Sequence, residues 1–361
     1  MAKPDKPDNS PKKKGNPLSI NPDAAKNHLQ RKQNKLNVSH LTKGILKRDR
    51  VLLSQAITLI ESENPDHQNI AQEIIENCLP HAHNSIRIGI TGSPGVGKST
   101  FIEAIGKYIT GLDHQLAVLT IDPSSQLSRG SILGDKTRMS KLAANQNAFI
   151  RPSPSGSSLG GVARKTRETI ILCEAAGFDT IIIETVGVGQ SETTVHSMVD
   201  FFLLLLLPGA GDELQGIKRG IVEMADLIAV NKADGDRIEA AKLAKRQYRN
   251  ALHLFPPKEN NWIPSVVNCS ALNNQGIDEI WNIIVDYQQK MTASRFFQKN
   301  RQQQSLQWFH ESIEGLLKDI FYRNPEMKKK LVQIEKAILE GQQSPYRASK
   351  ILLDSFLNNT K

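Results

Sequence analysis

The chain has 361 residues, of which 39% are hydrophobic and 23% charged, proportions typical of a soluble globular protein with a full core. Its longest apolar run, FFLLLLLP at 201–208, is far shorter than the roughly 18 residues needed to span a bilayer, so no membrane partner is expected. Cys78, Cys173 and Cys269 are scattered, which favours a reducing compartment, and we expect a cytoplasmic protein without disulfides.

The net charge of +9 is concentrated at the start of the chain, because residues 1–50 hold 13 Lys and Arg against 4 Asp. The remainder is neutral overall, so the folded part is not expected to bind nucleic acid. Residues 1–36 are rich in Lys, Pro and Asn and are predicted to form a disordered basic tail. The tail has no apolar stretch typical of a secretory signal, and its aspartates argue against a mitochondrial presequence.

The next segment, residues 37–84, is predicted to be helical. A single apolar stripe from Leu41 to Ile60 predicts one helix, which Asn64-Pro65 ends. A second helix follows, with Ile70, Ile74, Ile75 and Cys78 facing inward. We therefore expect a short helical extension before the first strand.

Residues 85–290 are expected to form the main domain. Apolar runs rich in Val, Ile and Leu alternate there with helical stretches, at 86–91, 116–121, 180–184, 201–207, 227–231 and 265–269. Uninterrupted runs of this kind are buried on both faces, so they predict an α/β fold with a doubly wound, mostly parallel sheet. Ligands bind such sheets beyond the carboxyl ends of the strands.

After the last predicted strand the chain is expected to be helical to its end. A long helix carries the Gln-rich stretch QKNRQQQ and several aromatic residues, and two further helices are predicted near 326–340 and 346–357. The aromatic surface of residues 291–361 exceeds what a lid over a ligand requires. We expect this region to hold a homodimer together.

A phosphate-binding loop follows the first predicted strand, where GSPGVGKS matches the pattern GxxxxGK[ST]. Its glycines allow consecutive backbone N–H groups to point at phosphate oxygens, and the following helix N-terminus also favours an anion. Lys98 would place a positive charge over the β and γ phosphates, and the Ser99 hydroxyl can ligate Mg²⁺. The predicted phosphate-binding residues are Gly92, Ser93, Pro94, Gly95, Val96, Gly97, Lys98, Ser99 and Thr100.

A base-reading motif, NKAD, ends the strand at 227–231. The Asp234 carboxylate can accept from the N1–H and the exocyclic amine of guanine together, and adenine has no such pair of donors. Lys232 is expected to lie along the ring and Asn231 to brace the loop. The end of the next strand would add backbone donors to the guanine oxygen, from Ser270, Ala271 and Leu272. The sequence therefore predicts GTP and GDP as ligands rather than ATP.

Several motifs together resemble the MeaB/ArgK family: GSPGVGKSTFIEA, DPSS with SILGDKTRM, SPSGSSLGGVARKT, ETVGVGQSE, PGAGDELQGIKRGI and NKAD. The likeness runs from about Leu41 to Asp278 and is weak in the C-terminal helices. It implies a P-loop fold of the signal-recognition and metallochaperone GTPase class. It also implies a GTPase chaperone of an adenosylcobalamin-dependent acyl-CoA mutase, chiefly methylmalonyl-CoA mutase, which hydrolyses GTP to GDP and phosphate.

The resemblance assigns the magnesium site to Ser99 and to three acids, Asp122, Asp135 and Glu184. Asp122 would lie beside the phosphate loop if the strands 86–91 and 116–121 are adjacent. Glu184, one methylene longer than the usual aspartate, is expected to act through a water molecule. The glycine turn that follows would approach the γ-phosphate through Gly187 and Gly189.

The catalytic residues that the resemblance implies are Lys98, Asp135, Glu184 and Lys218. Lys218 and Gln215 lie in PGAGDELQGIKRG, which would be a switch that contacts the mutase; a cobalamin adenosyltransferase is a candidate second partner. Two alternatives stay open. A nickel chaperone GTPase usually needs Cys and His clusters, and a kinase, as the name ArgK implies, needs an acceptor site and a base.

Overall fold

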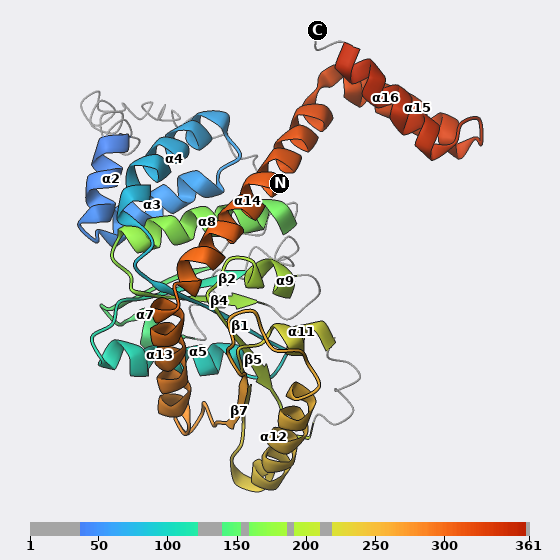
Figure 1. Ribbon diagram of the computed structural model, residues 1–361. Helices are drawn as coiled ribbons and strands as arrows, with labels where there is room; N and C mark the ends of the chain where they lie inside the picture. The colour runs from blue at the N-terminus through green and yellow to red at the C-terminus, as the bar shows by residue number, and fades with distance from the viewer. Residues whose placement is uncertain (1–36, 122–138, 153–158, 186–190, 210–218, 359–361) are drawn as a thin grey trace, which may run out of the picture.

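The computed structural model describes residues 37–121, 139–152, 159–185, 191–209 and 219–358 (Figure 1). Its centre is a seven-stranded sheet of order β3-β2-β4-β1-β5-β6-β7 in which every pairing is parallel. The doubly wound α/β fold predicted from the sequence is confirmed. The strands are β1 (Ile86–Gly92), β2 (Leu116–Ile121), β3 (Ala148–Pro152), β4 (Thr180–Thr185), β5 (Phe201–Leu206), β6 (Leu227–Val230) and β7 (Ser265–Asn268).

Strand β3 is a correction to the sequence analysis, which expected only six strands. Its sequence, AFIRP, holds Arg151 and ends in Pro152, so it lacks the uninterrupted apolar run of the other strands. It lies at the edge of the sheet and pairs with β2 alone, a position that tolerates both residues. The guanidinium of Arg50 donates to the carbonyl of Ala148 and so covers part of this edge.

The N-terminal segment forms three helices before a short 3-10 turn: α2 (Val38–Leu46), α3 (Arg50–Glu61), α4 (Pro65–Cys78) and η1 (Leu79–His81). The single helix expected up to Asn64 is therefore wrong. Arg48 adopts a left-handed conformation with φ of 63°, which breaks the helix. Asp49 then starts α3, because its carboxylate accepts from the backbone N–H groups of Val51 and Leu52.

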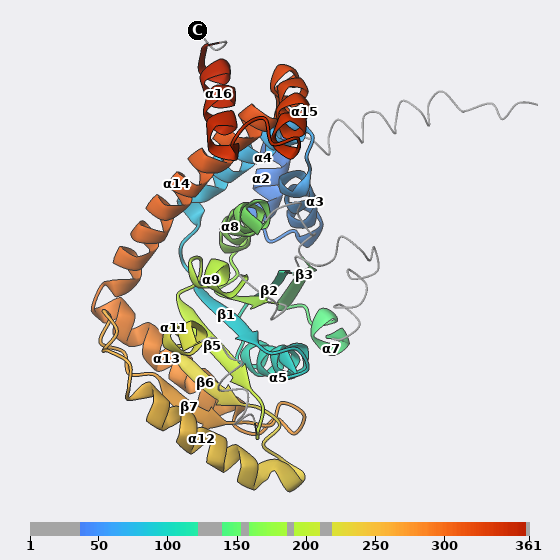
Figure 2. The same cartoon turned by 90° about the vertical axis from the view of Figure 1, so that its right-hand side faces the viewer.

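Helices cover both faces of the sheet (Figures 1 and 2). One face, with Ile88 and Ile90, packs against α5 and α13, and the other packs against α8, α9 and the N-terminal helices. A further apolar cluster joins β5 and β6 to α12. The helices are α5 (Lys98–Gly111), α7 (Ser140–Ala143), α8 (Leu159–Ala175), α9 (Ser191–His196), α11 (Arg219–Met224), η3 (Gly235–Arg237), α12 (Ile238–Leu252) and α13 (Ile277–Ala293).

The C-terminal part is helical, as expected, with α14 (Phe296–Arg323), α15 (Pro325–Leu339) and α16 (Pro345–Asn358). The 28-residue α14 runs past α8 and carries the pair α15 and α16 at its far end, away from the sheet (Figures 1 and 2). Across the ranges that the structure describes, none of the helices combines the length and apolar character that crossing a bilayer would require.

Candidate nucleotide-binding site

The phosphate loop lies at the carboxyl end of β1, between β4 and β5. Gly92, Gly95 and Gly97 have φ values of 155°, 81° and 95°. Residues other than glycine rarely adopt positive φ values of this kind. A Cβ at Gly92 would lie 2.5 Å from the carbonyl oxygen of Leu205. The loop therefore requires glycine there for both its conformation and its packing.

Lys98 is the first residue of α5, and its side chain is buried beneath the phosphate loop. Its Nζ donates to the carbonyl oxygens of Gly92 at 2.8 Å and Ser93 at 3.3 Å. Burial lowers the pKa of Lys98, and the carboxylates of Glu184 and Glu192 act in the opposite direction. A buried cation held by loop carbonyls, with the buried Ser93 hydroxyl lacking a partner among the described residues, fits a site for an anionic ligand.

Two of the predicted magnesium ligands lie together, because the Ser99 hydroxyl donates to Glu184 Oε1 at 3.3 Å. Glu184 is in register with Ile90 of β1, so β4 is the direct neighbour of the phosphate-loop strand. The adjacency of 86–91 and 116–121, on which the placement of Asp122 beside the loop depended, is therefore wrong, because β4 lies between β1 and β2. Asp122 itself and Asp135 lie outside the described residues.

The ends of β1 and β4 are also tied together on the opposite face of the sheet. There the Thr185 hydroxyl donates to the Thr91 hydroxyl at 2.9 Å, and both residues are buried. Thr91 precedes the first glycine of the phosphate loop, and Thr185 follows Glu184. The two strand ends are thus held in one arrangement by a contact that the sequence analysis did not foresee.

The base-reading residues form one unit with the phosphate loop. Asn231 Nδ2 donates to the Val96 carbonyl at 2.9 Å, and its Oδ1 accepts from the backbone N–H of Ala271 at 3.1 Å. Lys232 Nζ donates to the Gly95 carbonyl at 2.8 Å. Asn231 therefore contacts both the phosphate loop and the loop after β7.

Asp234 stands at the start of η3, and its carboxylate accepts a hydrogen bond from the Ser270 hydroxyl. The Ser270 hydroxyl also accepts from the backbone N–H of Asn273 at 3.2 Å, which orders the loop after β7. Leu272 is 77% exposed beside it, an unusual environment for a leucine. The predicted base-reading residues are thus close together in the fold.

Some predicted residues lie outside the described part of the chain, namely Gly187, Gly189, Gln215 and Lys218. The sequence analysis also missed one residue, Glu192, which is 5% exposed and acts electrostatically on Lys98. The sequence feature that could have identified Glu192 is its position directly after the glycine turn of ETVGVGQSE, in the first turn of a helix.

Comparisons with known proteins place this site in a family. The family model described as "Methylmalonyl Co-A mutase-associated GTPase MeaB" matches residues 53–326. The chain belongs to the MeaB family. The family resemblance, the P-loop fold and the GTPase activity inferred from the sequence are confirmed by this match and by relatives named as GTPases.

The similar proteins cover most of the chain. A Caulobacter vibrioides protein named "Putative GTPase" is 49% identical over 321 residues, which is 89% of this chain and 98% of that protein. The Escherichia coli "GTPase ArgK" is 46% identical over 82% of this chain and 90% of its own length. The mouse "Methylmalonic aciduria type A homolog, mitochondrial" is 44% identical over 88% of this chain and 79% of its own length.

A solved structure gives the same result for the fold. The crystal structure of a protein named "LAO/AO transport system kinase" superimposes with a TM-score of 0.70 at 38% identity, over 89% of this chain and 97% of that chain. The match extends beyond the GTPase domain into the helical extensions, since it spans nearly the whole of both chains. The two proteins therefore share the arrangement of helices before and after the parallel sheet.

Proposed function

We propose that the chain is a GTP-hydrolysing chaperone that gates cobalamin loading and protection of an adenosylcobalamin-dependent acyl-CoA mutase, with methylmalonyl-CoA mutase as the partner. The observation that carries the proposal is that Asn231 bonds the phosphate loop to the loop predicted to read guanine, in a family named for association with this mutase. The name of the mouse relative, which refers to methylmalonic aciduria, supports the same choice of partner.

In this proposal the nucleotide replaces contacts that the protein makes with itself. Asp234 accepts from the N1–H and the amine of guanine, and Lys98 leaves the Gly92 and Ser93 carbonyls for the β and γ phosphates. Bound Mg²⁺ would neutralise phosphate charge, held by Ser99 and Glu184 with Asp122 and Asp135 as further acids. The 3.3 Å separation of Ser99 Oγ and Glu184 Oε1 supports the first pair.

Glu184 has a second role in the proposed reaction. It is 8% exposed, lies between β1 and β2 in the sheet register, and projects towards the start of α5. A carboxylate there can accept a proton from a water molecule and so orient that water for attack on the γ-phosphate.

A kinase is the second candidate, because the protein whose structure superimposes on this chain is named "LAO/AO transport system kinase". The two activities differ in the fate of the γ-phosphate, which goes to water in one and to an acceptor in the other. Incubation with γ-labelled GTP separates them: we expect all label in inorganic phosphate. Label on a protein or small-molecule acceptor would favour the kinase.

A nickel chaperone GTPase has less support. Within the described ranges, no group of three or more His, Cys, Asp or Glu side chains is placed to hold a metal ion. Asp122 and Asp135 are not in those ranges, so this observation does not bear on the magnesium site. Equilibrium dialysis against Ni²⁺ without nucleotide tests the nickel alternative, and we expect no stoichiometric binding.

The mutase role is tested by GTP turnover with and without purified methylmalonyl-CoA mutase. We expect slow turnover by the chain alone and a marked acceleration by the mutase, since partners of GTPases act by ordering loops that sense GTP. Lys218→Ala is expected to reduce the ratio of stimulated to basal turnover, because Lys218 would be positioned by the partner. An equal ratio in wild type and variant would show that this loop does not carry the signal.

A further inference from the structure

Two buried threonine hydroxyls meet where the strands β1 and β4 end. Thr185 is fully buried and Thr91 is 1% exposed, and the Thr185 hydroxyl donates to the Thr91 hydroxyl at 2.9 Å. The last pair in register between the two strands is Ile90 with Glu184, so the threonines come directly after it. The side-chain hydrogen bond therefore joins the strands at the position where their backbone pairing stops.

The surroundings of this pair are apolar. In the sheet register Thr185 lies beside Ile121 of β2, and Thr91 lies beside Leu204 of β5, and both neighbours are buried. A valine has the same branched shape as a threonine and suits a strand equally well. The packing of the sheet alone therefore does not require a hydroxyl at either position.

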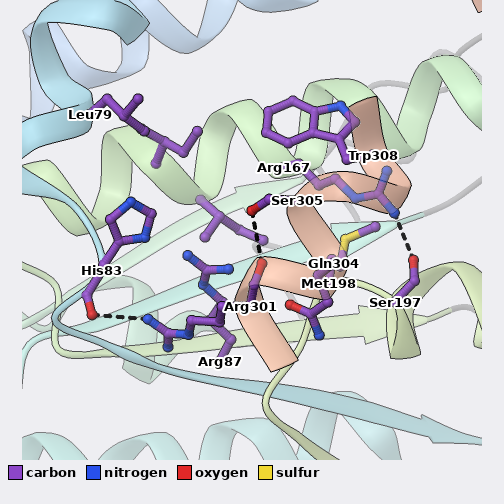
Figure 3. A pocket seen from close by; sticks show the side chains of 12 residues that line it. Leu79, His83, Arg87, Arg167, Ser197, Met198, Arg301, Gln304, Ser305 and Trp308 are labelled. Atoms are coloured by element: carbon purple, nitrogen blue, oxygen red, sulfur yellow. Dashed lines mark hydrogen bonds between the residues drawn. The ribbon is translucent and has the colours of Figure 1, made fainter. Parts of the chain in front are cut away.

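The hydrogen bond between the threonines also contributes little to folding, because both hydroxyls bond to water in the unfolded chain. A hydroxyl with a charged partner contributes more, as where the half-buried Ser197 accepts from the Arg167 guanidinium at 2.7 Å (Figure 3). The specific effect of the threonine pair is one of distance. Their oxygens are 2.9 Å apart, whereas two methyl groups would meet at roughly 3.5–4.0 Å.

Both strand ends carry residues of the candidate nucleotide site. Thr91 precedes Gly92, whose carbonyl accepts from Lys98 Nζ at 2.8 Å. Thr185 follows Glu184, whose carboxylate accepts from a hydroxyl at the start of α5. Because successive side chains of a strand point to opposite faces, the threonines lie on the face of the sheet opposite the Glu184 carboxylate. They can therefore set the distance between this carboxylate and the phosphate loop without touching the nucleotide.

We propose that Thr91 and Thr185 are positioning residues for GTP hydrolysis. Their hydrogen bond holds the Glu184 carboxylate at the distance from the phosphate loop at which it acts on the attacking water. The proposal rests on the role proposed above for Glu184. A misplacement of about 1 Å can lower a rate by about a hundredfold, and loss of the hydrogen bond lets the strand ends separate by a distance of that order. GTP affinity should depend on the pair much less, since the phosphate and base loops bind the nucleotide with their own atoms.

The double variant Thr91→Val with Thr185→Val tests the proposal, because it removes both hydroxyls and leaves neither of them buried without a partner. We expect single-turnover hydrolysis of bound GTP to slow by at least about tenfold, with the Kd for GTP within about threefold of wild type. The thermal unfolding midpoint should stay within about 4 °C of wild type, since replacing both partners of a neutral hydrogen bond by apolar groups of the same shape is nearly neutral for folding.

Three further variants show whether the hydrogen bond itself is responsible. Thr185→Ser keeps the hydroxyl and should hydrolyse bound GTP within about threefold of the wild-type rate. Thr91→Val alone should be about as slow as the double variant, because either substitution abolishes the same hydrogen bond. Thr169→Val is the matched control and should hydrolyse GTP like wild type. Thr169 is also buried, but its hydroxyl donates to the Lys165 carbonyl within α8.

The positioning role is overturned if the double variant hydrolyses bound GTP at the wild-type rate, or if Thr185→Ser is as slow as the double variant. It is also overturned if the double variant loses GTP affinity and thermal stability along with its rate, since the pair would then be purely structural. Glu184→Gln is measured alongside, and a wild-type rate in that variant would overturn the role of Glu184 and this proposal together. Failure of the unmodified chain to bind or hydrolyse GTP would instead overturn the proposed function.

Discussion

Asn231 joins two loops of the candidate nucleotide site. It is 2% exposed, and its side-chain amide bonds the phosphate loop on one side and the loop after β7 on the other. A Cβ at Gly97 would lie 3.0 Å from Asn231 Nδ2, which is a tight contact, and the φ of 95° there also favours glycine. One side chain therefore joins the loop predicted to bind phosphate to the loop predicted to read the base.

Asp234→Asn is expected to change the nucleotide preference from GTP towards XTP. The variant turns one acceptor of the carboxylate into a donor that meets the guanine N1–H, and the loss of a charged hydrogen bond costs about 2–3 kcal/mol. Calorimetry with both nucleotides measures this. Asp236→Asn, two residues further along in the exposed η3, is the control and should bind GTP like wild type. Unchanged GTP affinity in the first variant contradicts the guanine assignment.

The phosphate and base motifs could be predicted from the sequence because each is a contiguous loop whose geometry follows from its own glycines and strand end. The electrostatic effect of Glu192 on Lys98 could not, because it depends on the packing of α9 against β1 and β4. The hydrogen bond between Thr91 and Thr185 depends likewise on β1 and β4 being neighbours.

At the scale of elements, the sequence located the strands but not their lateral order. Continuous apolar runs mark six of the seven strands, and the short β3 escaped because an edge strand needs no such run. The sequence of β2, LAVLTI, does not indicate that its neighbour in the sheet is β4 rather than β1. The break between α2 and α3 was missed because the apolar stripe continues across Arg48 and Asp49.

A buried ionic network joins α8, β1 and α14 at the amino end of the sheet. Glu174 accepts from Arg87 Nε at 2.9 Å and from Arg87 Nη2 at 3.0 Å, and from the Ser85 hydroxyl at 2.6 Å. Arg301 lies 3.9 Å from the same carboxylate. Burial alone would raise the pKa of Glu174, but the two guanidinium groups and the hydrogen bonds outweigh burial and hold that pKa below its usual value of 4.5.

Glu174→Gln is expected to lower the free energy of unfolding at pH 7 by about 3 kcal/mol, because the variant leaves the Arg87 charge buried without its partner. The folded-state pKa of Glu174 is depressed, so its stabilisation is present above pH 4.5 and is lost as the pH falls through the folded-state value. The difference between variant and wild type should therefore shrink as the pH falls below 4.5. Denaturant titrations at pH 7, 5 and 3.5 measure it.

The control for this prediction is a surface ion pair. Glu259 and Lys299 are paired at the surface, with side chains 64% and 56% exposed. Glu259→Gln should change the free energy of unfolding by less than about 0.5 kcal/mol at each pH, because exposed pairs contribute little. Similar losses in both variants would show that burial of the Glu174 network does not set its contribution.

At the scale of the whole molecule, α14 has two different faces. Arg301, Gln304, Trp308 and Glu311 face the GTPase domain or the residues next to it. The opposite face carries apolar residues at alternating spacings of three and four, which is the pattern of a coiled-coil seam. These residues are 40–63% exposed: Leu306, Phe309, Ile313, Leu316 and Ile320.

We expect this seam to hold a homodimer, since a contiguous row of exposed apolar side chains marks a surface that another protein surface covers. Leu316→Glu with Ile320→Glu places two like charges on the seam without touching a buried residue, and should convert a dimer to a monomer in sedimentation velocity. Lys318→Glu, on the opposite side of the same helix by heptad position, is the control and should remain a dimer. Retained GTP binding would show that the double variant is folded. A folded double variant that still sediments as a dimer would place the interface elsewhere, on α15 and α16 or on the GTPase domain.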